Sequence, residues 1–115
     1  MTSVIEYIYK LSFEQHELVR VLHNFFEDYG LKSSLKYTIP FYSKNKVICY
    51  INPQKPRGAE IVFWQAQQFK NLHLLDIKKR KSMAGITFET IDSIDFDVLN
   101  LLITEGIEID DWMRK

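Results

Sequence analysis

The hydrophobic pattern of the chain changes its period at Gly30, and this change most constrains the fold. Between Ser12 and Tyr29, apolar side chains recur every three or four residues, which places them on one face of an α-helix. This stripe consists of Leu18, Val21, Leu22, Phe25, Phe26 and Tyr29. Ser12 and Gln15 form a capping-box pattern at its start, and Gly30 is the residue type that ends helices. We therefore expect an amphipathic helix before Gly30, preceded by a shorter helical pattern over residues 3–10.

After Gly30 the apolar segments are short and rich in β-branched and aromatic residues, which is typical of strands. We expect strands over residues 35–39, 46–52, 59–64 and 83–88, because residues typical of turns or loops separate these segments. The alternating positions of 46–52 are apolar on both faces, which predicts a central strand covered on both sides. The short connections favour antiparallel pairing in a meander.

The last part of the chain returns to helical spacing. Its apolar stripe consists of Val98, Leu99, Leu102, Ile103, Ile109 and Met113. Asp92, Ser93 and Asp95 offer N-caps for this helix, and Gly106 on the stripe indicates either close packing or a break. We therefore expect one α+β domain over residues 1–115, in which a mostly antiparallel sheet of about four or five strands packs against N- and C-terminal helices.

The net charge of zero conceals an uneven distribution along the chain. Residues 31–81 carry eleven basic side chains against only Glu60 and Asp76, a net charge of +9. Residues 1–30 carry −3 and residues 82–115 carry −6. Two interpretations stay open: the charges form a functional dipole, or the fold brings them together and neutralises them.

Several classes of protein are excluded or disfavoured by the residues present. Cys49 is the only cysteine, which excludes a disulfide framework and a multi-cysteine metal site, and its apolar strand predicts a small buried side chain. No apolar run approaches the length of about 20 residues that a membrane span needs. The N-terminus does not read as a signal peptide, so we expect a soluble cytoplasmic protein without membrane partners. Without a phosphate loop, nucleophile elbow or His-Glu-x-x-His motif, we expect no enzyme and no cofactor.

Two groups of residues are candidates for binding a metal. His23 and Glu27, four residues apart on the polar side of the first long helix, could supply half of a site, although a solvated helix face explains them more simply. A carboxylate patch for a hard cation would form if the two long helices packed side by side and brought together Glu14, Glu17, Asp110 and Asp111.

Aromatic residues gather around Pro40, beside the strongly basic middle of the chain. We expect a non-catalytic binding module with an apolar cleft lined by Tyr37, Phe41, Tyr42 and Trp64. Arg80 or Lys81, in the basic run 78–81, would meet an anionic group at its mouth. The partner would be a small anionic molecule or another protein. The basic run with Tyr42, Tyr50 and Trp64 would also suit single-stranded nucleic acid, but zero net charge and a pI of 6.8 argue against a general nucleic-acid role, and a solvated loop explains the run more simply. Leu101 and Trp112 lie off the apolar stripe of the last helix, where they could contact a second copy of the chain in a homo-oligomer.

The order of these segments resembles that of the YdhG-like family, also called domain of unknown function 1801. The resemblance rests on residues 37–42 (YTIPFY), 47–51 (VICYI) and 60–63 (EIVF), and it extends over about residues 15–109. It implies an α+β fold in which the terminal helices cover one sheet. The chain departs from the family at Gln65 and Ala66, where members usually have a glycine.

The resemblance also implies an alternative function. Some members of the family are described as frataxin-like iron chaperones, which bind iron through acidic residues on the first helix and the sheet edge. A frataxin-like iron-delivery protein would use Fe(II), and Glu14 and Glu17 are the candidate ligands here.

Overall fold

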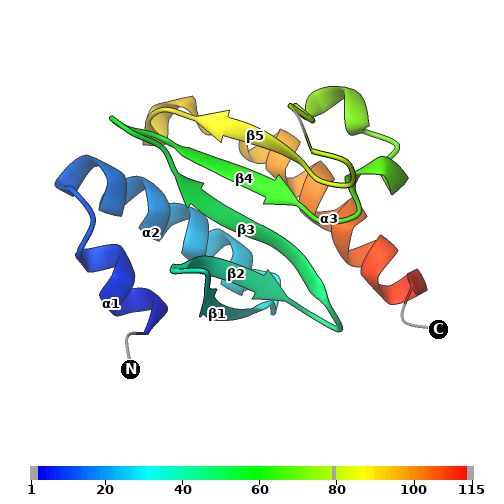
Figure 1. Ribbon diagram of the computed structural model, residues 1–115, viewed down its shortest axis with the longest axis horizontal. Helices are drawn as coiled ribbons and strands as arrows, with labels where there is room; N and C mark the ends of the chain where they lie inside the picture. The colour runs from blue at the N-terminus through cyan, green and yellow to red at the C-terminus, as the bar shows by residue number, and fades with distance from the viewer. Residues whose placement is uncertain (1–2, 79, 114–115) are drawn as a thin grey trace.

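The computed structural model describes residues 3–78 and 80–113, which form a sheet with helices packed against it (Figure 1). Five antiparallel strands lie side by side in chain order: β1 (Lys32–Lys36), β2 (Ile39–Ser43), β3 (Val47–Pro53), β4 (Ala59–Phe63) and β5 (Ala84–Phe88). The α-helices are α1 (Val4–Tyr9), α2 (Phe13–Asp28) and α3 (Phe96–Met113). Short 3₁₀ turns are η1 (Ala66–Gln68), η2 (Leu72–Leu74) and η3 (Ile91–Ser93). The predicted α+β fold is confirmed.

The first long helix begins and ends where the sequence predicts. Ser12 Oγ accepts a hydrogen bond from the Gln15 amide at 3.4 Å, and Gly30 follows the helix with a φ of 80°. The Gln15 side chain does not complete the capping box. It donates instead to the carbonyls of Gln54 and Gly58, so it ties the start of α2 to the β3–β4 hairpin.

One face of the sheet, which we call the inner face, carries α2 and α3. Tyr42, Cys49 and Phe63 are direct neighbours across β2, β3 and β4, so their side chains share this face. Phe26 of α2 packs on Tyr42 with ring centroids 5.0 Å apart, while Gly106 of α3 lies against Phe63. Both helices lie behind the sheet in Figure 1. The opposite face, which we call the outer face, is turned toward the viewer.

β3 is the central strand, as predicted, but the prediction that it is covered on both sides is wrong. A β-bulge explains why both of its faces are apolar. Tyr42 pairs with Cys49, but Ser43 pairs with Val47, which leaves Ile48 as the extra residue. Ile48 and Cys49 are both buried, and the Ile48 methyl group faces Gly106 of α3. The bulge therefore turns two consecutive apolar side chains toward the helices.

The strand predicted over residues 35–39 is also wrong, because a tight turn interrupts it. Tyr37 and Thr38 have φ values of 52° and 64°, and the chain reverses there between β1 and β2. Two positive φ angles are typical of the two-residue turns of β-hairpins, in which Asn-Gly is the favoured sequence. Tyr37 and the β-branched Thr38 do not match this preference, so the sequence does not predict the turn.

The last helix confirms the expected cap and resolves the role of its glycine. Asp95 Oδ1 accepts a hydrogen bond from the Val98 amide at 3.1 Å, at the start of α3. The helix continues through Gly106, so the glycine marks close packing and not a break. A Cβ atom on Gly106 would lie 3.0 Å from Ile48 Cγ2.

In the described ranges, no helix is both long enough and apolar enough to span a bilayer.

A candidate binding face on the outer side of the sheet

A row of residues crosses all five strands on the outer face. Strand pairing aligns Ser34, Phe41, Tyr50, Val62 and Gly85 from β1 to β5. Phe41 precedes an inward-facing tyrosine on β2, and successive strand residues point to opposite faces. The whole row therefore faces away from the helices.

Aromatic side chains gather around the middle of this row. The Phe41 and Tyr50 rings stack with centroids 4.8 Å apart and an interplanar angle of 17°. The Trp64 ring centroid lies 6.5 Å from each of theirs, and the Tyr37 centroid lies 6.0 Å from that of Phe41. We call these four residues the aromatic cluster. Phe41 is only 4% exposed, whereas Tyr37 is 86% exposed and the other two rings are half-buried. A bound molecule would therefore meet three rings supported by Phe41.

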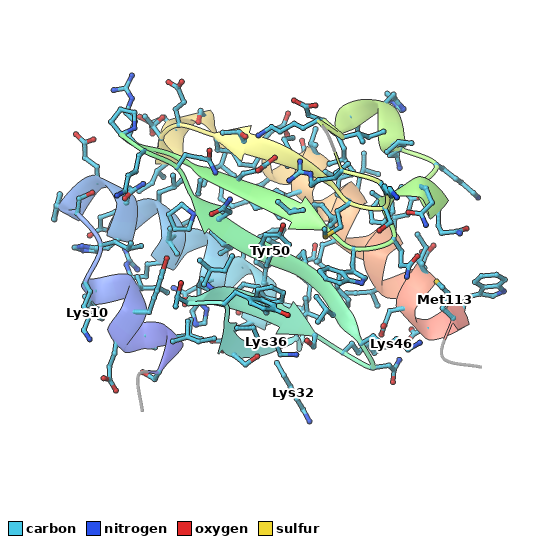
Figure 2. All side chains as sticks on the ribbon, in the orientation of Figure 1. Lys10, Lys32, Lys36, Lys46, Tyr50 and Met113 are labelled. Atoms are coloured by element: carbon cyan, nitrogen blue, oxygen red, sulfur yellow. The ribbon has the colours of Figure 1, made fainter. Side chains whose placement is uncertain are left out.

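Two lysines lie on the β1 side of the aromatic cluster. Lys32 and Lys36 alternate with Ser34 along β1, so they share its outer face, and both are exposed. Figure 2 shows both lysines at the β1 edge of the sheet, with Lys32 projecting past that edge, and Tyr50 over the middle strands. The β1 edge of the outer face is thus positively charged.

Toward the opposite edge of the same face, a buried carboxylate pairs with two partly exposed cations. The Glu60 carboxylate, 2% exposed, lies 2.9 Å from Arg80 Nη2 and 3.2 Å from Lys78 Nζ. The hydrogen bond to Glu60 is the main cause that raises the pKa of Arg80, and Tyr50 contributes as well. Gly85 leaves the room this carboxylate needs, since a Cβ atom there would lie 2.5 Å from Glu60 Oε2. Two cations facing one carboxylate give this edge an excess positive charge.

The structure brings together most of the predicted ligand-binding residues. Tyr37, Phe41 and Trp64 lie in the aromatic cluster, and Arg80 lies beside it. Lys81 is exposed, and residue 79 of the same basic run lies outside the described residues. The predicted lining by Tyr42 is wrong, because this residue points to the inner face and is 0% exposed.

Three residues of the outer face were not predicted from the sequence: Lys32, Lys36 and Glu60. Lys32 and Lys36 belong to the face through strand register, and Glu60 pairs there with Arg80 and Lys78. Tyr50 and Lys78 were candidates only as members of an aromatic and basic set, and strand register places Tyr50 beside Phe41. Strict alternation along residues 47–51 does place the Tyr50 side chain on the other face of the strand from Cys49. No local pattern shows which strand pairs with the Tyr50 strand, because pairing is a property of the whole sheet.

The possible half-site for a metal in α2 is a buried histidine that contacts Tyr42 and an exposed glutamate. His23 is 1% exposed, its Nδ1 lies 2.8 Å from Tyr42 Oη, and its Nε2 lies 3.2 Å from Glu27 Oε1. Burial lowers the pKa of His23, and the nearby Glu27 carboxylate opposes that shift. The expectation of a solvated histidine is therefore wrong. Cys49 is buried as predicted, and burial raises the pKa of its thiol.

The carboxylate patch predicted between the two long helices does not form. Asp110 accepts hydrogen bonds from the amides of Asn45 and Lys46, each at 2.9 Å, at the tip of the β2–β3 hairpin. Glu17 pairs with Arg20 at 2.6 Å on α2. Within residues 3–78 and 80–113, no three His, Cys, Asp or Glu side chains are grouped so that they could hold a metal ion.

Comparison with known proteins does not add to this geometry. No family model, no curated protein and no solved structure matches the chain. The resemblance to the YdhG-like family stays a prediction, and the function has to be argued from the residues of the outer face.

Proposed function

We propose that this protein is a non-catalytic binding module that holds an anionic partner on the outer face of its sheet. One observation carries the proposal: the aromatic cluster lies between Lys32 and Lys36 at one edge and Lys78 and Arg80 at the other. Aromatic residues and arginine are enriched where proteins bind partners, because they combine apolar area with a polar group. The face thus offers both apolar contact and positive charge.

The turn that carries Tyr37 supports a binding role. Tyr37 and the β-branched Thr38 both adopt left-handed φ angles, which cost about 1–2 kcal/mol per residue outside glycine. Such strain tends to persist where function requires the side chain. Here the strained turn presents a tyrosine ring that is 86% exposed.

The buried positions of the reactive groups favour binding over catalysis. Cys49 is 0% exposed and His23 is 1% exposed, so neither is placed to attack a substrate from solution. No observation favours the iron-delivery alternative, since Glu17 is paired with Arg20 and the described residues hold no metal-binding group.

Thermal unfolding at low salt tests the proposal. The probes are citrate, a nucleotide, poly-L-glutamate, a short oligonucleotide and, under anaerobic conditions, Fe(II). A probe present at a hundred times its Kd adds about 2.7 kcal/mol to the free energy of unfolding, which raises Tm by several degrees for a domain of this size. We expect such a shift with at least one of the anionic probes.

A matched pair of variants connects the shift to the outer face. Lys32→Gln/Lys36→Gln removes two exposed charges from the face, and Lys10→Gln removes an exposed charge at the end of α1. We expect the first variant to reduce the anion-induced shift and the second to keep it. The proposal is wrong if no anionic probe raises Tm, or if both variants respond as the unmodified protein does.

A further inference from the structure

The opposite charges of the chain occupy different layers of the molecule. Residues 82–113, which include α3, carry eight acidic side chains and no lysine or arginine. Residues 3–30, which form α1 and α2, carry five acids against Lys10 and Arg20. Lys44 at the β2–β3 hairpin pairs with Asp111 of α3, and Arg57 in the β3–β4 connection pairs with Glu89, which follows β5. The zero net charge therefore averages an acidic helical layer and a basic sheet layer.

The spacing of the cations sets the size of the bound molecule. The cationic positions lie on β1 and around β4 and β5, at opposite edges of the five-stranded sheet. Three to four spacings between strands of about 4.8 Å make this distance about 14–19 Å. A small anion cannot contact both edges, whereas a chain of repeated negative charges can.

The aromatic cluster selects among such chains. Its accessible rings, Tyr37, Tyr50 and Trp64, lie between the two cationic edges. An acidic peptide supplies negative charges without a planar group at each repeat. A single-stranded nucleic acid supplies both, because its phosphates meet cations while its bases stack on aromatic rings.

From these relations we propose that the outer face binds single-stranded nucleic acid, with bases on the accessible rings and phosphates on Lys32, Lys36 and Lys78. This inference rests on the proposed function and names its partner. Arg80 and Lys78 both pair with Glu60, so the two cations leave one excess charge. We assign the phosphate to Lys78 because its side chain is 48% exposed, against 19% for Arg80. Zero net charge does not oppose such binding, because the acidic side chains of the helices are separate from the cations of the outer face.

Fluorescence anisotropy with a labelled ten-nucleotide single-stranded RNA of mixed sequence tests the inference. The comparison probes are the DNA of the same sequence, an abasic DNA of the same length and poly-L-glutamate. We expect the RNA or the DNA to bind at least tenfold more tightly than the abasic strand. With three phosphates neutralised, log Kd should rise with log salt concentration with a slope of about 2.

Each other outcome separates this inference from the proposed function. If the abasic strand binds as tightly as the RNA and DNA, or if only poly-L-glutamate binds, the outer face takes anions without bases. In either case this inference is rejected and the proposed function stands. If none of the anionic probes binds here or raises Tm in the thermal panel, both are rejected.

Variants with matched controls locate the site. Tyr37→Ala removes an exposed ring and should weaken RNA binding by about 5- to 150-fold, the effect of losing one stacked base. Tyr37→Leu, which keeps apolar volume without a ring, should weaken it similarly. Trp112→Ala, which removes an exposed ring from α3, should leave binding unchanged. Equal losses in Tyr37→Ala and Trp112→Ala, with unfolding temperatures preserved, would overturn the assignment.

The charged positions have a separate readout. Lys36→Gln should lower the salt slope by about 0.7, because one fewer phosphate is neutralised. Lys10→Gln serves as the control, and it should keep the slope of the unmodified protein. A slope that Lys36→Gln leaves unchanged would remove β1 from the binding site and overturn the inference.

Discussion

His23 Nδ1 lies 2.8 Å from Tyr42 Oη in the core, so a hydrogen bond joins α2 to the inner face of β2. Both residues are almost fully buried, at 1% and 0% exposure. Removing the hydroxyl leaves the imidazole nitrogen without this partner, and an unsatisfied buried group costs about 1–3 kcal/mol. We therefore expect Tyr42→Phe to lower the free energy of unfolding by this amount in urea titrations. Tyr37→Phe, at an exposed position, should change it by less than about 0.5 kcal/mol.

The same histidine should make stability depend on pH. Burial lowers the pKa of His23 below its ordinary value of 6.5, while Glu27 opposes the shift and Tyr42 faces the other ring nitrogen. Between the lowered pKa and 6.5 the unfolded chain binds more protons than the native protein, so stability rises with pH. The contribution is complete above about pH 6.5 and is lost as the pH falls.

The measurement is a series of thermal melts between pH 5 and 8. His23→Gln keeps a polar partner for Tyr42 and removes the titrating group, so its stability should fall less at acid pH. His16 and His73 remain in both proteins, and the difference between the two curves isolates His23. Parallel curves would contradict the prediction.

Two arginines in different surroundings should differ in their effect on stability. Arg80 pairs with the buried Glu60 at 2.9 Å, whereas Arg57 pairs with the exposed Glu89 at 3.5 Å. Arg80→Ala leaves Glu60 with Lys78 alone, and breaking a buried pair costs up to about 3–5 kcal/mol, so we expect about 2–3 kcal/mol here. Arg57→Ala should cost less than about 1 kcal/mol. Chemical denaturation of both variants measures the difference, and similar small losses would show that Glu60 does not need Arg80.

The parts of the fold that the sequence predicts are those with a local cause. The stripe of α2, its stop at Gly30 and the Asp95 cap of α3 each depend on residues within a few positions of one another. The bulge at Ile48 has no such cause, because it places that side chain against Gly106, far away in the chain. The Tyr37 turn carries none of the residues that favour its geometry.

The candidate site was predicted in part for the same reason. The aromatic residues around Pro40 and the basic run 78–81 are visible in the sequence as candidates for the site, and the structure places Tyr37, Phe41 and Trp64 together. Whether Phe41 or Tyr42 faces the site depends on which face the helices cover. That choice is made by long-range packing of α2, through contacts such as Phe26 with Tyr42.

Gln65 occupies a position where glycine should be more stable. Its φ of 56° is left-handed, and its side-chain oxygen accepts a hydrogen bond of 3.3 Å from Gln67 Nε2. Glycine at this position avoids the Cβ strain, although it loses more entropy on folding, so we expect Gln65→Gly to stabilise by about 0.5–1 kcal/mol. Gln67→Gly, in the η1 turn, is the matched control and should be neutral or destabilising. Thermal melts of both decide the matter, and a loss of stability in Gln65→Gly would contradict the prediction.

The β1–β2 turn allows strain and binding to be separated. Thr38→Gly relieves a left-handed β-branched residue at φ 64° and should stabilise the protein by about 0.5–1 kcal/mol. It leaves the Tyr37 ring in place, so binding to the outer face should persist. Tyr37→Asn/Thr38→Gly creates the favoured Asn-Gly turn and should stabilise further, but it removes the exposed ring and should weaken binding. Thermal melts and anisotropy on the same samples measure the two effects. If both variants bind equally well, the strained turn is not maintained for the sake of Tyr37.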